Sequence, residues 1–146
     1  MEALKLLLIE DDPGNIKLVE EAVTANSPDH ELIVTNYGEE ALDFLENDIG
    51  KKGRPDVILL DLKLPRMTGI EFLEEIKNND NFSSIPVIVL TNSDDPEVMK
   101  QVNTYPSTSY IIKPSGYTEY LELINFIVEY WKKNSQIPHG RDFKMN

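Results

Sequence analysis

Short apolar runs alternate along the chain with longer segments whose apolar residues recur every three or four positions. The short runs have the length of β-strands, and their lack of regular polar alternation is typical of strands buried on both faces. Five such strands are predicted, at Leu4–Ile9, Leu32–Val34, Asp56–Leu60, Val87–Leu90 and Tyr110–Ile112. Because a helical segment follows each of them, the pattern predicts five βα units around a parallel sheet, in an α/β fold.

Capping residues and apolar spacing locate the helices. Asp12 and Pro13 open the first helix, because aspartate is a favoured N-cap and proline fits the first helical position. The remaining four helices are predicted at Glu39–Asn47, around Ile70–Ile76, from Pro96 onward and at Tyr117–Lys133.

The last helix is the most apolar of the five. Its sheet-facing residues are predicted to be Leu121, Ile124, Val128 and Trp131. Its other apolar residues, which we expect to lie partly outside the core, are Tyr120, Leu123, Ile127 and Tyr130. An exposed apolar patch of this kind favours a protein interface, so the sequence predicts a homodimer surface on this helix and the fifth strand.

Composition narrows the class of protein. At 146 residues the chain fits a single domain, predicted over residues 1–133, with an aperiodic tail at 134–146 that we expect to be flexible. It has no cysteine, and its two histidines are too few for a transition-metal site. The net charge of −12 disfavours direct nucleic-acid binding. The apolar run Leu6–Ile9 is too short for a signal peptide or a membrane span, so we expect a soluble, cytoplasmic protein.

Polar residues stand at the carboxyl ends of four predicted strands. They are Asp11 and Asp12 after the first strand, Asp61 after the third, Thr91 after the fourth and Lys113 after the fifth. In an open parallel sheet these ends lie along one edge, and ligands bind in the crevice where the strand order reverses. If the strand order is 2-1-3-4-5, the first and third strands flank that crevice and bring the three aspartates together.

Three ionised carboxylates this close repel one another, so the cluster predicts either a bound proton or a divalent cation. Mg²⁺ is the expected cation, because it takes oxygen ligands and is commonly bound by one or two carboxylates and a phosphate. We predict that Asp11, Asp12 and Asp61 are its ligands, together with a backbone carbonyl near Lys63. Glu10 is a further acidic candidate beside them.

The remaining residues at this edge suit phosphoryl transfer. Lys113 offers a positive charge and Thr91 a hydroxyl to two phosphoryl oxygens, while Asp61 would attack the phosphorus in line. Seen alone, the acidic pair would be a helix cap, the threonine a turn residue and the lysine an ordinary surface residue. Their joint placement at one sheet edge favours the phosphoryl site.

Four segments together resemble the receiver domain of two-component response regulators. These segments are Leu8–Asp12, Ile58–Pro65, Val89–Ser93 and Tyr110–Pro114. The resemblance spans residues 4 to 133 and implies a doubly wound, flavodoxin-like (βα)₅ fold. It also implies Mg²⁺-dependent transfer of a phosphoryl group from a sensor histidine kinase to Asp61, and a cis peptide bond between Lys113 and Pro114. The chain is further similar to small stand-alone receivers that partner phytochrome-like kinases.

The same resemblance implies a switch. The hydroxyl of Thr91 would move toward the phosphoryl group and the ring of Tyr110 would turn inward, which remodels the face made by the fourth helix, fifth strand and fifth helix. The protein would then be a phosphoacceptor rather than an enzyme, limited to its own phosphorylation and slow dephosphorylation. With no output domain, it would signal in trans to a downstream protein or relay partner. The segment Tyr105–Thr108 departs from the glycine-containing turn usual before the fifth strand.

Two other classes of protein remain open from the residues alone. A haloacid-type Mg²⁺-dependent phosphatase also uses an aspartate nucleophile, a threonine and a lysine, but normally has a second aspartate where this chain has Lys63. A flavodoxin-like cofactor binder shares the strand order, but its phosphate loop would be rich in glycine or hydroxyl groups. Asp11 and Asp12 occupy that position here and would repel a phosphate.

Overall fold

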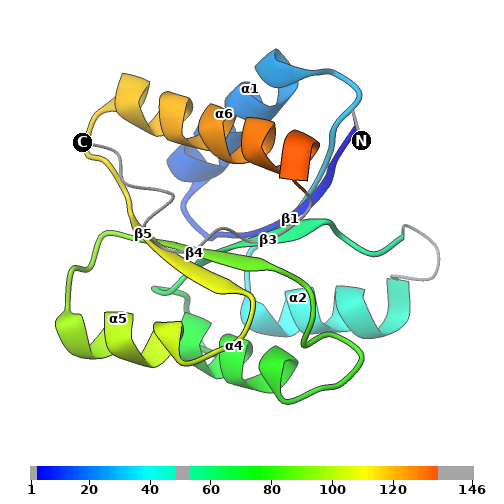
Figure 1. Cartoon of the computed structure of the whole chain (residues 1–146), viewed down its shortest axis with the longest axis vertical. Helices are drawn as coiled ribbons and strands as arrows, with labels where there is room; N and C mark the ends of the chain where they lie inside the picture. Colours follow the sequence, from blue (N-terminus) through cyan, green and yellow to red (C-terminus); the bar gives the residue numbers. More distant parts are fainter. Residues whose placement is uncertain (1–2, 49–52, 135–146) are drawn as a thin grey trace.

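A computed structural model describes residues 3–48 and 53–134, and it contains one five-stranded parallel sheet. The strands are β1 (Lys5–Ile9), β2 (Glu31–Thr35), β3 (Val57–Asp61), β4 (Val87–Thr91) and β5 (Thr108–Ile112). Their spatial order is β2-β1-β3-β4-β5 (Figure 1). The predicted fold class and strand order are therefore confirmed.

Helices cover both faces of the sheet (Figure 1). They are α1 (Pro13–Asn26), α2 (Gly38–Asp43), the π-helical turn η1 (Phe44–Asp48), α4 (Gly69–Lys77), α5 (Pro96–Asn103) and α6 (Tyr117–Asn134). Helices α1 and α6 lie side by side on one face, whereas α2, α4 and α5 lie on the other. The second helix predicted from sequence is thus an α-helix that continues into a π-helical turn. The residues of the predicted tail beyond 134 lie outside the described part.

Side-chain caps fix where several helices begin. Asp12 caps α1, since its carboxylate accepts a hydrogen bond from the backbone N–H of Gly14 at 3.3 Å. Thr68 and Glu71 form a reciprocal capping box at the start of α4. Asp95 caps α5 in the same way as Asp12 caps α1. The first helix therefore begins where the Asp12-Pro13 pair predicts.

The central strands are apolar except at one end, because successive residues enter two separate cores. Along β1, Leu6 and Leu8 pack under α1 and α6, whereas Leu7 and Ile9 pack under the helices of the other face. All four side chains are essentially inaccessible to water. Burial of each contributes roughly 1.5–3 kcal/mol to stability, and it holds the strand ends at fixed positions along the sheet edge.

The predicted division of the last helix into buried and exposed apolar residues is wrong in part. Ile124, Val128 and Trp131 are buried as expected, but so are Tyr120, Leu123 and Ile127, which the sequence analysis placed partly outside the core. The reason is that α6 packs against α1 as well as against the sheet. Its buried apolar face is therefore wider than the face of a helix that packs against the sheet alone. These three residues therefore offer no exposed dimer patch.

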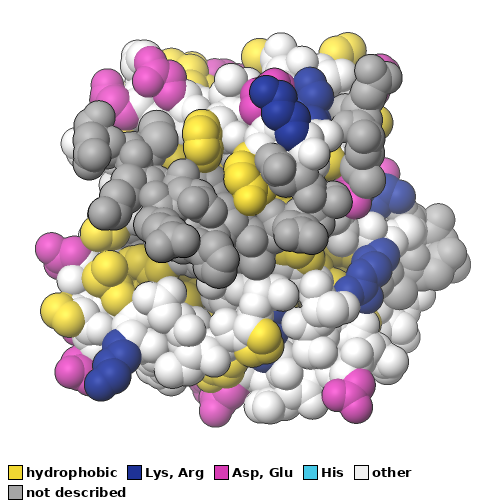
Figure 2. Space-filling view, viewed as in Figure 1, with side chains coloured by type: hydrophobic (Ala, Val, Ile, Leu, Met, Phe, Trp, Pro, Cys, Tyr) yellow, Lys and Arg dark blue, Asp and Glu magenta, His cyan; other side chains and the backbone are white. Residues whose placement is uncertain are grey.

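The surface is acidic over a wide area. Asp and Glu side chains are spread over the face shown in Figure 2 and do not gather in a single patch. No helix within residues 3–48 and 53–134 has the length and apolarity needed to span a membrane.

The turn before β5 contains a residue in the left-handed backbone region. Ser107 has φ of +52°, and its carbonyl accepts a hydrogen bond from the backbone N–H of Val87 at 2.9 Å, at the start of β4. Residues other than glycine adopt this conformation at a cost of roughly 1–2 kcal/mol. Ser107 therefore occupies a position in this turn for which glycine is better suited.

We expect Ser107→Gly to raise the free energy of unfolding by about 0.5 kcal/mol. The gain is smaller than the strain that it removes, because glycine also loses more conformational freedom on folding. Urea denaturation of both proteins measures the difference. Ser109→Gly is the matched control, since Ser109 is a buried residue inside β5 where glycine should destabilise. A Ser107→Gly protein that is less stable than the parent would contradict the inference that the backbone of Ser107 is strained.

Candidate acidic phosphoryl site

The structure brings the predicted polar residues to one edge of the sheet. Asp61 is the last residue of β3 and Thr91 the last of β4, and Asp11 and Lys113 follow β1 and β5 closely. Parallel pairing holds these ends level with one another, as the hydrogen bond from Lys113 N to Thr91 O at 2.7 Å shows. Residues that are far apart in sequence therefore share one cleft.

The ammonium group of Lys113 lies between two carboxylates. Its Nζ atom is 2.9 Å from Oε1 of Glu10 and 3.6 Å from Oδ2 of Asp61. The side chains of Lys113 and Glu10 are almost completely buried, and only 12% of the Asp61 side chain is exposed. Because few water molecules can screen these charges, the Coulomb attraction within each pair is stronger than in a surface pair, and it offsets the cost of burying the charges. The Lys113–Pro114 peptide bond is trans, so the expected cis bond is wrong; trans is the lower-energy isomer before proline.

Glu10 plays a larger part in the cleft than the sequence analysis gave it. Its second oxygen, Oε2, accepts a hydrogen bond from the backbone N–H of Asp12 at 3.2 Å, while Oε1 binds Lys113. Burial raises the pKa of Glu10 to about 7, although Lys113 opposes the rise. The sequence did hold a signal, because an acidic residue directly after the apolar run Leu6–Ile9 needs a cationic partner when it is buried.

Three carboxylates converge in the cleft. One oxygen from each of Glu10, Asp11 and Asp61 lies within 4.8 Å of the others, with Asp11 exposed to solvent. Such a set of hard oxygen donors, with one solvent-facing member, fits a Mg²⁺ ion that keeps part of its water shell. Asp12 stands outside this group and caps α1, so its role as a ligand stays a prediction. Lys63 donates its backbone N–H to Oδ1 of Asp61 at 3.1 Å, and a ligand role for its carbonyl also stays a prediction.

Thr91 and Tyr110 are both bound to the same residue, Ser93. The hydroxyl of Thr91, which is fully buried, accepts a hydrogen bond from the Ser93 backbone N–H at 3.2 Å. The hydroxyl of Tyr110 donates to the Ser93 carbonyl. Burial raises the pKa of Tyr110, so this hydroxyl keeps its proton. Ser93 thus connects the two residues predicted to switch, a link that sequence spacing alone does not reveal.

A cavity of about 430 Å³ opens beside Lys113. It lies between the first turn of α1 and the segment that joins β5 to α6, and its lining includes Asp12, Asn15, Asn92 and Tyr117. The cavity gives a second molecule access to the cationic side of the cleft.

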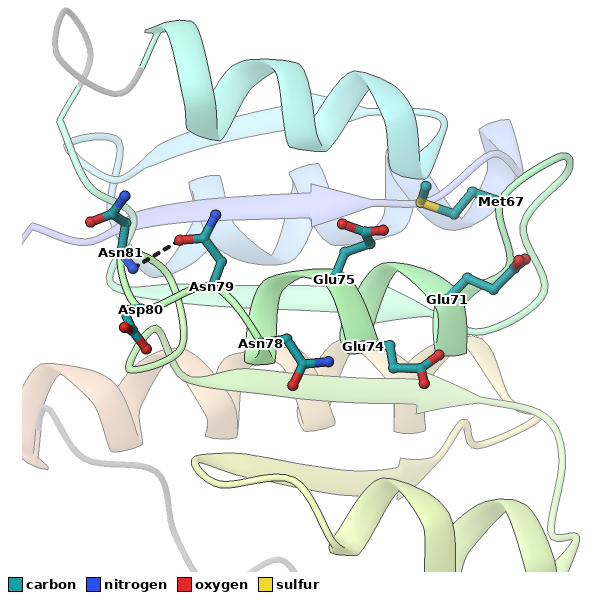
Figure 3. A pocket seen from close by; sticks show the side chains of 8 residues that line it. All are labelled: Met67, Glu71, Glu74, Glu75, Asn78, Asn79, Asp80 and Asn81. Atoms are coloured by element: carbon teal, nitrogen blue, oxygen red, sulfur yellow. Dashed lines mark hydrogen bonds between the residues drawn. The ribbon is translucent and has the colours of Figure 1, made fainter.

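A separate hollow of about 820 Å³ runs along α4, away from the cleft (Figure 3). Three glutamates of α4 and the polar segment Asn78–Asn81 line it, and Met67 lies at the end near the loop that follows Asp61. Neither Lys113 nor the three carboxylates of the cleft are among its lining residues.

Comparisons with known proteins agree with this geometry. The family model described as the response regulator receiver domain matches residues 6–125. The chain belongs to the response regulator receiver family. Response regulator Rcp1 of Synechocystis sp. is 33% identical over 135 residues, which cover 91% of this chain and 92% of Rcp1. Members of this family are signalling modules, and neither the family model nor this relative belongs to an enzyme family.

Two solved structures extend the likeness to three dimensions. The crystal structure of the phosphorylated cyanobacterial phytochrome response regulator RcpA has a TM-score of 0.85 and 31% identity, and the match covers 94% of this chain and 99% of RcpA. The crystal structure of the Mn²⁺-bound form of Rcp1 has a TM-score of 0.83 and 32% identity, and the match covers 93% of this chain and 99% of Rcp1. The receiver resemblance found in the sequence is therefore confirmed.

Replacing Asp11 by asparagine should stabilise the metal-free protein. Removing one of the three converging negative charges lowers their repulsion by on the order of 1 kcal/mol at this partly solvated distance. The variant should also gain less stability from added Mg²⁺ than the parent does, because it has lost a ligand charge. Urea unfolding in EDTA and in excess MgCl₂ measures both effects.

Glu20→Gln serves as the control, since Glu20 is exposed on α1 and outside the three-carboxylate group. Equal stability of the parent and Asp11→Asn in EDTA, together with an equal gain in MgCl₂, would show that the cluster is neither strained by repulsion nor a cation site.

Proposed function

We propose that this receiver domain accepts a phosphoryl group on Asp61 from a sensor histidine kinase, in a Mg²⁺-dependent reaction. The observation that carries the proposal is the position of Asp61, whose carboxylate is nearly buried, lies beside the ammonium group of Lys113 and shares the cleft with two further carboxylates. A carboxylate with this environment can act as a nucleophile once the negative charge around it is compensated.

The transfer exchanges one bond to phosphorus for another. An oxygen of Asp61 bonds to phosphorus while the bond from phosphorus to the imidazole nitrogen of phosphohistidine breaks, and the imidazole departs with the kinase, in line with the attacking oxygen. Lys113 binds one phosphoryl oxygen, and its existing contact with Asp61 places the charge beside the oxygen that reacts. A Mg²⁺ ion held by Asp11 and Asp61, with Asp12 and the Lys63 carbonyl as further candidate ligands, would offset the charge of the carboxylates and the phosphoryl group.

We further propose that phosphorylation changes the surface formed by α5, β5 and α6, the elements called the fourth helix, fifth strand and fifth helix above. To reach a phosphoryl oxygen, the Thr91 hydroxyl would donate its own proton and move toward that oxygen, which would pull on the hydrogen bond that it accepts from the Ser93 N–H. Because Tyr110 is bound to the carbonyl of the same residue, a shift of the Ser93 backbone also moves the tyrosine. The changed surface would be recognised by a downstream protein or relay partner, or by a second copy of the chain.

The receiver function has more support than the haloacid-type phosphatase. The family match and the two structural neighbours are response regulators. In addition, the second residue after Asp61 is Lys63, where the phosphatase class normally has the aspartate that acts as its general acid.

Incubation with acetyl phosphate and MgCl₂ should add one phosphate to the protein, and Asp61→Asn should abolish the addition. The amide keeps the shape of the side chain but is not a nucleophile. Intact-mass spectrometry measures the product, and EDTA should prevent its formation. Phosphate on Asp61→Asn, or repeated turnover of a phosphate ester by the parent, would refute the proposal and favour the phosphatase.

Phosphorylation should change the environment of Tyr110, and this change should require the Thr91 hydroxyl. Fluorotyrosine NMR provides the measurement, with Tyr110→Phe used to assign the signal. In Thr91→Val we expect Asp61 to be phosphorylated while the Tyr110 signal stays close to its unphosphorylated position. A Tyr110 signal that does not move in fully phosphorylated parent protein would rule out its role as the switch.

A further inference from the structure

The loop that follows Asp61, residues 62–68, forms one wall of the acidic cleft and is fixed at both ends. At its start, the Lys63 backbone N–H binds Oδ1 of Asp61 at 3.1 Å. At its end, the Gly69 backbone N–H binds the Leu62 carbonyl at 3.0 Å. A side chain on Gly69 would come within 2.7 Å of the Asp61 carbonyl, so the loop closes tightly against the strand end.

The middle of this loop adopts a strained conformation over an aromatic ring. Arg66 has φ of +66°, a backbone region that residues other than glycine seldom occupy. Its guanidinium carbon lies 5.1 Å from the centre of the Tyr37 ring, which is within the range of a cation–π interaction. Backbone strain of this kind persists only where surrounding contacts hold it in place. The contact with Tyr37 is such a restraint.

The next residue, Met67, contacts the same turn between β2 and α2. A Cβ atom built on Gly38 would lie 2.9 Å from the sulfur of Met67, so this glycine leaves the space that the methionine fills. Figure 3 shows Met67 extending from the loop toward the first turn of α2. Arg66 and Met67 therefore attach the loop to Tyr37 and Gly38, two adjacent residues of another βα connection.

That connection is itself bound to the cleft. The side-chain amide of Asn36 donates a hydrogen bond to the Glu10 carbonyl at 3.0 Å, and the Asn36 backbone N–H binds Glu40 at 2.7 Å. Glu10 in turn holds Lys113. The turn containing Tyr37 is thus held in place from the β1 side of the cleft, and it provides a fixed support for the loop on the β3 side.

We propose that Tyr37 and Arg66 are positioning residues, which together hold the loop after Asp61 against the acidic cleft and thereby strengthen its binding of Mg²⁺. The proposal rests on the proposed function, in that the cleft is taken to be the Mg²⁺ site. Neither residue contacts a carboxylate of the cation cluster. Their effect is exerted through the loop that carries Lys63, whose backbone already binds Asp61.

The expected effect is moderate. A cation–π contact at a partly exposed site such as this one alters an equilibrium by about two- to fivefold. Tyr37→Leu and Arg66→Asn should each weaken Mg²⁺ binding by that factor and speed amide exchange in the loop by a similar factor. Asparagine is chosen because it tolerates positive φ, so the guanidinium is lost while the backbone conformation is kept.

The test uses the full chain, with the Mg²⁺ affinity of the unphosphorylated protein measured by calorimetry and loop mobility by hydrogen exchange. Tyr37→Phe is the matched control, since it keeps the ring and should behave like the parent. The double variant Tyr37→Leu with Arg66→Asn should be no weaker than either single variant, because both remove the same contact. Urea unfolding identifies any variant that has lost global stability instead.

Several results would overturn the inference. These are unchanged Mg²⁺ affinity and loop exchange in both single variants, fully additive losses in the double variant, or a loss in Tyr37→Phe equal to that in Tyr37→Leu. A parent protein that fails to bind Mg²⁺ would also overturn it. A parent that binds Mg²⁺ and shows the expected pattern, but is never phosphorylated, would refute the proposed function and leave the positioning role in place.

Discussion

The cleft depends on the burial of one ammonium group among carboxylates. Burying the Lys113 ammonium group without a counter-charge would be costly, because the charge is removed from water. Glu10 and Asp61 supply that counter-charge on two sides. One cation cannot balance Glu10, Asp11 and Asp61 together, so the metal-free cleft must hold either a proton or excess negative charge. Burial raises the pKa of Glu10, and the neighbouring Asp61 adds to the rise.

This charge arrangement exists only because of the order of the strands. Glu10 and Asp11 follow β1, Asp61 ends β3 and Lys113 follows β5, so the three groups come from strands separated by dozens of residues. The order β2-β1-β3-β4-β5 sets β1 beside β3, and the register between β4 and β5 brings Lys113 level with Thr91. Apolar packing on both faces of the sheet keeps these ends in place, because a slip of one residue would send buried side chains into the opposite core. The energy that maintains the site therefore comes mostly from residues that never touch it.

The resemblance to receiver domains supplied the strand order, and polar residues at the ends of apolar strands then placed Asp61, Thr91 and Lys113 at one edge of the sheet. The predictions from sequence were wrong where the burial of a residue depends on more than one neighbouring element. Leu123 and Ile127 are buried because α6 packs against α1. The prediction from helical spacing considered only the contact of this helix with the sheet. Strand ends differed by one or two residues, and the π-helical turn η1 has no signature in the apolar spacing. The link through Ser93 consists of backbone atoms, for which side-chain identity carries no information.

Two chains of contacts leave the cleft in opposite directions, and they differ in kind. Toward β5, Thr91 and Tyr110 are both hydrogen-bonded to Ser93, the first to its backbone N–H and the second to its carbonyl. Toward α2, the loop after Asp61 contacts a turn that is bound through Asn36 to the carbonyl of Glu10, directly after β1. A signalling response requires a structural element that can adopt two conformations. A binding site, in contrast, requires surrounding residues that keep a single conformation. Under the proposed function, the β5 side of the cleft would move when a phosphoryl group is bound, and the loop after Asp61 would stay in place.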